Sequence, residues 1–318
     1  MAEKSGQKIN DLIFKELIKR GYSLEGNTRI WNIADSKLWY LRPEQAQAFL
    51  DLEDEEEYKK SVTQKEVDLI NDNIGEIMSR FDDVPINVID IGCGDGRKAA
   101  MFIEKFKGKK IKYCPIDISG YMVNKAIERV GKIDKVEEVV ELQWNISDFE
   151  NIENISTVLR QGEYKRNLFL LLGNTIGNFE INELLYQIRT SMKGGDLILI
   201  GNGLNYKNPE EIVDSYNSDH FNKFSAYPLI QLGLTEEEIE FGVRFKNSRI
   251  ESFYTLKVDK KISFLNRTVE FHKGDQVIVI VSYKYDKSDF ISFLNLYFDE
   301  VMPKISDDGT YILALCRK

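Results

Sequence analysis

Three glycines alternate with other residues in one short segment, VIDIGCGDGRK, which spans positions 88–98. Gly92, Gly94 and Gly96 can take positive φ angles and let a ligand approach the backbone closely. A dinucleotide-binding loop has its third glycine one position later, where this chain has Arg97. The segment therefore predicts a site for a nucleotide-like ligand other than NAD. A tight turn without a ligand is the alternative.

Two further candidate binding groups follow along the chain. Asp117 ends the next strand-like run, about twenty residues past the glycines, where a carboxylate can accept hydrogen bonds from both ribose hydroxyls. It could instead cap the following helix, although Ser119 can fill that role. Asp148 and Phe149 follow the third run, where methyltransferases hold an adenine by a hydrogen bond and an apolar wall. A phenylalanine alone is more often core.

The glycine spacing resembles the first motif of class I methyltransferases, and these groups, in this order, favour S-adenosylmethionine (SAM) as the cofactor.

The fourth strand-like run ends in LFLLLGNTIGNFE, residues 168–180. A second substrate meets a cofactor beyond the carboxyl ends of parallel strands, so Asn174, Thr175 and Asn178 are candidates to contact it. An asparagine carboxamide could hold an amine with its lone pair aimed at a methyl group. A local turn and helix capping are the alternatives for Asn178.

The elements that must position these residues alternate between strand-like and helical patterns from about residue 60 to 204. This alternation predicts an α/β fold with a doubly wound parallel sheet, Rossmann-like as in class I methyltransferases. Segments 86–91, 167–172 and 196–201 are apolar at nearly every position, which is typical of central strands covered on both faces. The third strand is expected within VVELQWNI, residues 139–146.

The alternation stops after Gly203 and resumes near the C-terminus. Two antiparallel strands, 249–258 and 261–271, and a third at 276–285 indicate an inserted lobe. A helix capped by Ser288 and a last strand then complete the sheet. We expect four segments: 1–50 and 205–285 form a substrate-binding lobe, and 51–204 and 286–318 form the SAM-binding domain.

Charge and composition exclude several functions. The net charge of −9 repels nucleic acid. The lack of a long apolar run or a secretory signal predicts a cytoplasmic protein without a membrane span. The three cysteines are far apart and only two histidines are present, so no metal site is expected and the cysteines should be reduced or buried. The acidic run 51–57 is interpreted as a solvated linker or helix start.

Taken together, the motifs resemble the histidine Nα-methyltransferases of ergothioneine biosynthesis, most strongly from about residue 87 to 178. The resemblance implies that Gly92 and Lys98 meet the methionine part of SAM, with Lys98 suited to its carboxylate. It likewise implies that Asp117 binds the ribose, and that Asp148 and Phe149 bind the adenine.

On the acceptor side, the resemblance implies that Asn178 binds the amino-acid end of the substrate and that Tyr216, in DSYNSDHFNKF, helps to bind its carboxylate. WYLRPEQ is similar to a family segment that makes Tyr40 a further candidate. In VIVIVSYKY, Ser282 matches the family, but Ile280 stands where a glutamate would grip an imidazole. Histidine is therefore disfavoured as substrate, because an apolar pocket does not hold a hydrogen-bonding side chain.

The sequence thus predicts SAM-dependent N-methylation of a small, amino acid-like amine by direct displacement at the methyl group. Asn178 would orient the amine, and Tyr40 or a water molecule would accept its proton. A protein or peptide methyltransferase is one alternative, and a non-catalytic SAM-binding regulator is another. A dehydrogenase is disfavoured by Arg97 and by the pair at 148 and 149.

Overall fold

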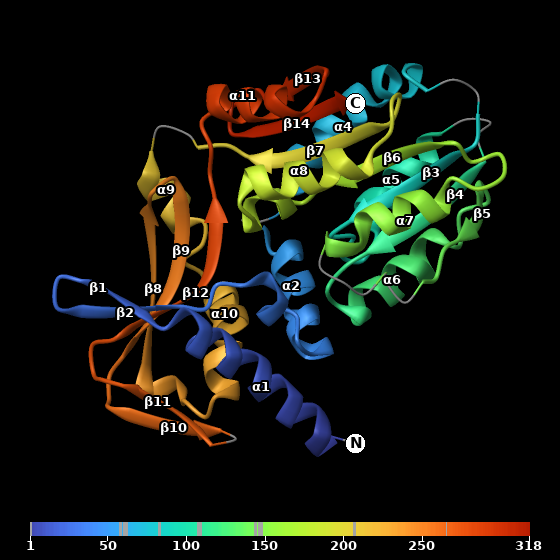
Figure 1. Cartoon of the computed structure of the whole chain (residues 1–318). Coiled ribbons are helices and arrows are strands. Elements are labelled where there is room, and N and C mark those ends of the chain that lie inside the picture. Colours follow the sequence, from blue (N-terminus) through green and yellow to red (C-terminus); the bar gives the residue numbers. More distant parts are fainter. Residues whose placement is uncertain are drawn as a thin grey trace. The chain divides into compact units, whose positions relative to one another are not determined.

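The computed structural model describes residues 2–56, 59, 63–81, 84–106, 110–142, 145, 149–205, 208–264 and 266–318. Contacts divide the chain into two compact units, each made from two separate segments. Unit 1 comprises Met1–Leu52 and Asn208–Tyr283, and unit 2 comprises Glu53–Lys207 and Lys284–Lys318. Both units are visible in Figure 1, where colour follows the sequence.

Unit 2 is built on a seven-stranded sheet with the order β13-β14-β7-β6-β3-β4-β5. The five strands from β7 to β5 are parallel, and β14 and β13 are antiparallel. The predicted α/β fold with a mostly parallel sheet is therefore confirmed. The strands are β3 (Ile86–Ile91), β4 (Ile111–Ile116), β5 (Val136–Val139), β6 (Arg166–Leu171), β7 (Leu197–Gly203), β13 (Glu300–Ile305) and β14 (Tyr311–Arg317).

Helices cover both faces of this sheet (Figure 1). Successive residues of the central strand β3 point to opposite faces, so Val88 is packed on one side and Ile89 on the other. Val88 lies in a cluster with α4, α5 and α6, and Ile89 lies in a cluster with α7, α8 and α11. These helices are α4 (Gln64–Ser79), α5 (Arg97–Lys105), α6 (Gly120–Val130), α7 (Ile152–Leu159), α8 (Ile181–Ser191) and α11 (Lys287–Tyr297).

Unit 1 contains a five-stranded sheet with the order β1-β2-β12-β9-β8 and a separate two-stranded sheet, β10-β11. The N-terminal and inserted segments share the larger sheet, because β2 pairs in parallel with β12. The strands are β1 (Tyr22–Glu25), β2 (Thr28–Asn32), β8 (Ile239–Lys246), β9 (Arg249–Leu256), β10 (Lys260–Phe264), β11 (Arg267–Phe271) and β12 (Gln276–Tyr283). The helices are α1 (Ala2–Arg20), α2 (Pro43–Asp54), α9 (Pro209–Asp214) and α10 (Asp219–Gln231), with short 3-10 turns η1 (Ser36–Leu38) and η6 (Glu236–Glu238). The last two residues of α2, Glu53 and Asp54, belong to unit 2.

Three local predictions were wrong. The predicted strand 261–271 is a hairpin of β10 and β11, because Asn266 takes a φ of 61° and turns the chain. The third parallel strand, β5, ends at Val139, where the predicted one began. Ser288 lies inside α11, whose N-cap is Asp286.

The three cysteines are buried and free, as expected. Burial raises the pKa of Cys114 to about 12, so this thiol stays protonated. None of the helices in the described ranges is long and apolar enough to cross a membrane.

Candidate active site

The glycine loop follows β3 directly, and each of its glycines has a positive φ: 69° at Gly92, 51° at Gly94 and 74° at Gly96. A Cβ on Gly92 would lie 2.7 Å from Cγ2 of Thr175, and one on Gly96 would lie 2.8 Å from Cα of Ala126. These two positions must be glycine for the loop to pack. A Cβ on Gly94 would meet nothing within 4 Å, so this side of the loop has room for a ligand.

Asp117 follows β4 and is bound to the glycine loop. Its Oδ2 accepts a hydrogen bond from the backbone N–H of Gly94 at 3.1 Å, and its Oδ1 accepts one from Ser119 at 2.9 Å. Burial raises the pKa of Asp117 to about 6, although these N–H groups favour the ionised form. The helix-cap role belongs to Ser119, whose hydroxyl accepts from the N–H of Met122, so Asp117 is not needed for it.

Asn145 supports this edge of the sheet and was not singled out from the sequence. Its backbone carbonyl accepts from the N–H of Asp117 at 2.9 Å. Its buried carboxamide donates to the carbonyls of Pro115 and Val140 at 2.6 and 2.9 Å. These bonds fix the chain after β4 beside the chain after β5. Nothing in the sequence distinguishes this asparagine from one in a surface turn.

A second buried acid, Asp90, lies at the end of β3. Its Oδ2 accepts a hydrogen bond from the hydroxyl of Tyr113 at 2.7 Å. Burial raises the pKa of Asp90 to about 7, and the negative charge of Asp117 adds to this rise. Asp90 is only 4% exposed, so its carboxyl has little surface to offer a ligand.

The adenine pair is only partly described. Phe149 is buried and its ring lies 4.9 Å from that of Phe179, within the core cluster that α7 and α8 cover. Phe149 therefore packs in the core, and its contact with an adenine stays a prediction. Asp148 lies outside the described residues.

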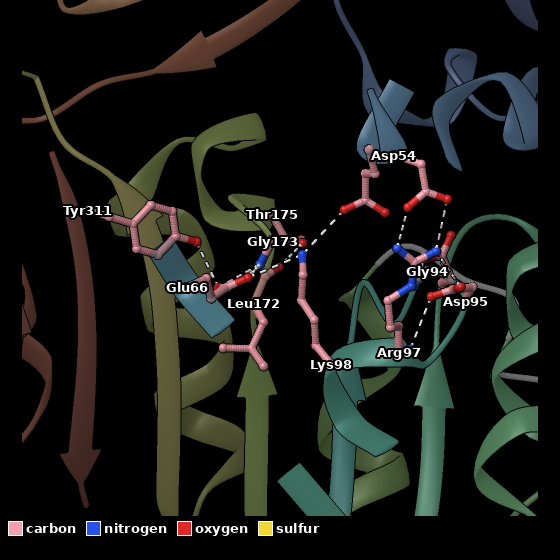
Figure 2. A network of polar contacts seen from close by, with 12 residues as sticks. Asp54, Glu66, Gly94, Asp95, Arg97, Lys98, Leu172, Gly173, Thr175 and Tyr311 are labelled. Carbon is pink, nitrogen blue, oxygen red and sulfur yellow. Dashed lines mark hydrogen bonds and ion pairs between the residues drawn. The ribbon is translucent and has the colours of Figure 1, made fainter. Parts of the chain in front are cut away.

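Lys98, in the first turn of α5, is held by two carboxylates (Figure 2). Its Nζ lies 3.2 Å from Oε2 of Glu66 and 3.3 Å from Oε1 of Glu53. Burial opposes the charge on Lys98, but the two acids outweigh it and raise its pKa above the ordinary lysine value. The ammonium lies beside the backbone of Gly173, just after β6, since a Cβ there would be 2.5 Å from Nζ.

Glu66 is fully buried in unit 2, and the sequence analysis missed it. Its carboxylate accepts hydrogen bonds from the N–H of Gly173 at 2.9 and 3.0 Å and from the hydroxyl of Tyr311 at 2.7 Å (Figure 2). A Cβ on Gly201, in the middle of β7, would lie 1.9 Å from Oε1 of Glu66. The glycine is therefore what makes room for the acid. In the sequence, a glycine directly after an apolar strand-like run could have indicated that another group approaches the backbone closely at this position.

The acidic run 51–57 was interpreted as a solvated linker or helix start, and for its first residues this was wrong. Residues up to Asp54 form the last turn of α2. Glu53 contacts Lys98, and Oδ1 of Asp54 lies 2.7 Å from Nη1 of Arg97. Both acids therefore pair with cations that directly follow the glycine loop.

The edge after β6 contains the three predicted polar residues, but their roles differ. The side-chain oxygen of Asn174 accepts from the N–H of Gly203, and Thr175 packs on the glycine loop and donates to a backbone carbonyl. Asn178 ends the 3-10 turn η5 (Thr175–Asn178), and its half-buried carboxamide has no hydrogen bond to the described residues. The N-cap of α8 is Glu180, so the capping alternative for Asn178 is wrong.

In unit 1, a series of ring contacts joins two acceptor-side candidates. The ring of Tyr40 lies 5.9 Å from Phe224, that of Phe224 lies 6.3 Å from Phe221, and that of Phe221 lies 5.2 Å from Tyr216. The hydroxyl of Tyr216 donates to Oγ of Ser282 at 3.2 Å. The structure thus brings Tyr40, Tyr216 and Ser282 to one aromatic cluster, in which the phenylalanines were not predicted.

Ile280 lies two residues before Ser282 on β12, so both side chains share one face of the sheet. Ile280 is 4% exposed and Ser282 is 5% exposed. A bulge in the pairing with β9 precedes Ile280, and the indole N–H of Trp39 donates to the carbonyl of Val279 at this bulge at 2.8 Å. This face of β12 is therefore fixed in place and apolar at position 280.

A mostly parallel, doubly wound sheet with a glycine loop after its first strand and an acid after its second is the Rossmann-like arrangement that binds nucleotide-containing cofactors. The family model described as "Histidine-specific methyltransferase, SAM-dependent" matches residues 45–317. The chain belongs to this family and is a SAM-dependent enzyme. No curated protein sequence matches it.

Three solved structures to which the chain shows a distant likeness are as follows. One is a SAM-dependent methyltransferase from Clostridium acetobutylicum, with a TM-score of 0.48, 12% identity and coverage of 85% of this chain and 98% of the other. Another is human N-acetylserotonin methyltransferase in complex with SAM, with a TM-score of 0.42, 14% identity and coverage of 100% and 67%. An amino pentose methyltransferase from Micromonospora echinaspora, bound to SAM, has a TM-score of 0.38, 10% identity and coverage of 80% and 92%.

Proposed function

We propose that this methyltransferase transfers a methyl group to the amine of a small, amino acid-like acceptor that carries an apolar or aromatic side chain. The observation that carries the proposal is the buried Ile280, two positions before Ser282 on the same face of β12, where Ser282 is hydrogen-bonded to Tyr216. Ile280 offers no hydrogen-bonding partner to an imidazole N–H. A polar substrate group buried there would lose its hydrogen bonds to water without replacing them, so an apolar side chain is favoured. The ring cluster that contains Tyr216 supplies further apolar surface.

For the cofactor, we propose that the open side of Gly94 faces the bound nucleoside and that Asp117 accepts hydrogen bonds from the ribose hydroxyls. Each oxygen of Asp117 accepts a hydrogen bond from a backbone N–H, which fixes the orientation of the carboxylate and leaves acceptor capacity for a ribose hydroxyl. Gly92 and Gly96 keep the loop close-packed around it. Asp148 and Phe149 are proposed to bind the adenine, and Lys98 the methionine carboxylate.

Bound SAM supplies an electrophilic methyl group, and the chain's own residues must present a neutral amine to it. We propose that the half-buried carboxamide of Asn178 accepts a hydrogen bond from the acceptor's nitrogen and orients it. Tyr40, or a water molecule, takes the proton that an ammonium must lose before its lone pair can react. Positioning and exclusion of water are then the main contributions of the protein, which in oriented reactions lower the barrier by several kcal/mol, up to about 7–11 kcal/mol.

Charge and composition support a small acceptor. The net charge of −9 disfavours nucleic acid, and the three buried, unpaired cysteines fit the reducing cytoplasm in which we propose that the enzyme acts. We propose no macromolecular partner.

The proposal is tested by incubating the purified enzyme with methyl-deuterated SAM and a mixture of amino acids and common biogenic amines. Mass spectrometry then identifies any labelled product. Labelling of an amine with an apolar or aromatic side chain is the expected result. Efficient labelling of histidine would contradict the inference from Ile280, and labelling of none would exclude a common small acceptor.

A further inference from the structure

Lys98 carries one positive charge between two carboxylates. Its Nζ is 3.2 Å from Glu66 and 3.3 Å from Glu53, and its side chain is 17% exposed. The group of three therefore has an excess negative charge if both acids are ionised. A third carboxylate cannot join the ammonium favourably, because like charges at this distance and burial repel each other strongly. One of the two acids must leave if a ligand carboxylate is to bind Lys98.

Glu66 is the acid that cannot leave. Its side chain has no exposed surface, and besides Lys98 it is held by the N–H of Gly173 and the hydroxyl of Tyr311. Moving it would leave these donors unsatisfied in the interior, which costs about 1–3 kcal/mol for each group.

Glu53 is held much less firmly. Its side chain is 14% exposed, and among the described residues Lys98 is the one hydrogen-bonding partner of its carboxylate. It lies in the last turn of α2, where the partial negative charge of the helix end disfavours an acid, and no basic residue lies in that turn. Glu53 can therefore leave Lys98 at low cost by turning toward solvent.

We propose that Glu53 is a placeholder for the methionine carboxylate of the cofactor, and that the cofactor displaces it from Lys98 on binding. This rests on the proposed function, in which Lys98 receives that carboxylate. Glu66 stays in place and fixes the ammonium beside Gly173 for both partners. Glu53 thus acts as a positioning residue that lowers cofactor affinity in exchange for keeping the buried lysine paired.

The substitution E53Q tests this, with binding measured by isothermal titration calorimetry. S-adenosylhomocysteine contains the amino-acid carboxylate, whereas methylthioadenosine contains the same nucleoside without it. We expect E53Q to bind S-adenosylhomocysteine about 3- to 5-fold more tightly, the scale of a partly exposed ion pair, and to bind methylthioadenosine unchanged. D54N is the matched control, because Asp54 is the next residue of α2 but pairs with Arg97; its ratio of the two affinities should equal that of the wild type.

The outcomes separate the two proposals. If the wild type binds neither nucleoside, the proposed cofactor site is wrong and the displacement falls with it. If the wild type binds both and E53Q binds S-adenosylhomocysteine no more tightly, the displacement alone is wrong. Weaker binding by E53Q would show that Glu53 contacts the cofactor directly instead of competing with it.

Discussion

The hydroxyl of Tyr216 and the hydroxyl of Ser282 form a hydrogen bond of 3.2 Å inside unit 1, where both side chains are almost fully buried. Two residues separated by 66 positions along the chain thus share one polar contact in otherwise aromatic surroundings. Each hydroxyl has one O–H donor and two acceptor lone pairs. One O–H of the pair can therefore turn to a substrate carboxylate while the other still donates within the pair. We therefore expect this pair to contact the carboxylate of the acceptor.

The substitution Y216F should therefore weaken acceptor binding. Loss of one hydrogen bond to a charged group predicts a KM for the acceptor about 10-fold higher, with a smaller change in kcat. Steady-state kinetics with the acceptor found by mass spectrometry measure this. The affinity for S-adenosylhomocysteine is the control and should be unchanged. A fall in kcat at constant KM would contradict a binding role for Tyr216.

The substitution I280E should shift the preference toward histidine. A carboxylate at this position can accept a hydrogen bond from an imidazole N–H. A hydrogen bond between a substrate and a charged side chain changes kcat/KM by roughly tenfold or more. The measurement is the ratio of kcat/KM for histidine to that for the preferred acceptor. I280M keeps the position apolar at similar volume and should leave the ratio unchanged. An unchanged ratio in a folded I280E variant would remove position 280 from the specificity argument.

The sequence predicted the central sheet well because its strands are buried on both faces. Runs of apolar residues in β3, β6 and β7 leave few alternative structures. The hairpin of β10 and β11 was missed because Asn266 was not recognised as a turn residue, although asparagine tolerates the positive φ it adopts. The turn between β8 and β9 depends on Asn247 and Ser248 in the same way.

Within the candidate site, the glycine loop and Asp117 were predictable because their spacing along the chain is local. Glu66 was not, because its burial depends on Gly173, Gly201 and Tyr311, which lie more than 100 residues further along the chain. An acid in an amphipathic helix is normally on its solvent face. Only the tertiary structure shows that this one faces a lysine and a glycine in the interior.

The substitution G201A should destabilise the fold strongly. The added methyl would lie 1.9 Å from Oε1 of Glu66, so the acid or β7 must move, with an expected loss of about 1–3 kcal/mol in unfolding free energy. Urea denaturation measures this. G194A is the matched control, since a Cβ there meets nothing within 4 Å, and its stability should be close to that of the wild type. If G201A were as stable as G194A, the packing between Gly201 and Glu66 would be looser than the structure shows.

The buried Asp90 should make stability depend on pH. Its folded-state pKa of about 7 is above the ordinary value of 3.8, so the folded protein binds the proton more tightly and loses stability as the pH rises from about 4 to 7. D90N stays neutral and can still accept from Tyr113. At pH 8 we expect D90N to be more stable than the wild type by about 1 kcal/mol or more, and at pH 5 the difference should shrink. Denaturation curves of D90N and of the wild type at pH 8 and pH 5 measure this difference. If D90N were less stable than the wild type by the same amount at both pH values, the prediction would be contradicted.

Asp117 should make cofactor affinity depend on pH in a lower range. Its pKa of about 6 means that the carboxylate is ionised at neutral pH and takes up a proton as the pH falls through 6, which removes acceptor capacity for one ribose hydroxyl. We expect the affinity for S-adenosylhomocysteine to fall several-fold between pH 7.5 and about pH 5, measured by calorimetry. D117N should bind weakly at both values without this step. D90N should keep the step, because Asp90 is buried and is hydrogen-bonded to Tyr113. If the pH-dependent change in affinity disappeared in D90N and persisted in D117N, the titrating carboxyl would be that of Asp90. Asp117 would then not be the residue that binds the ribose.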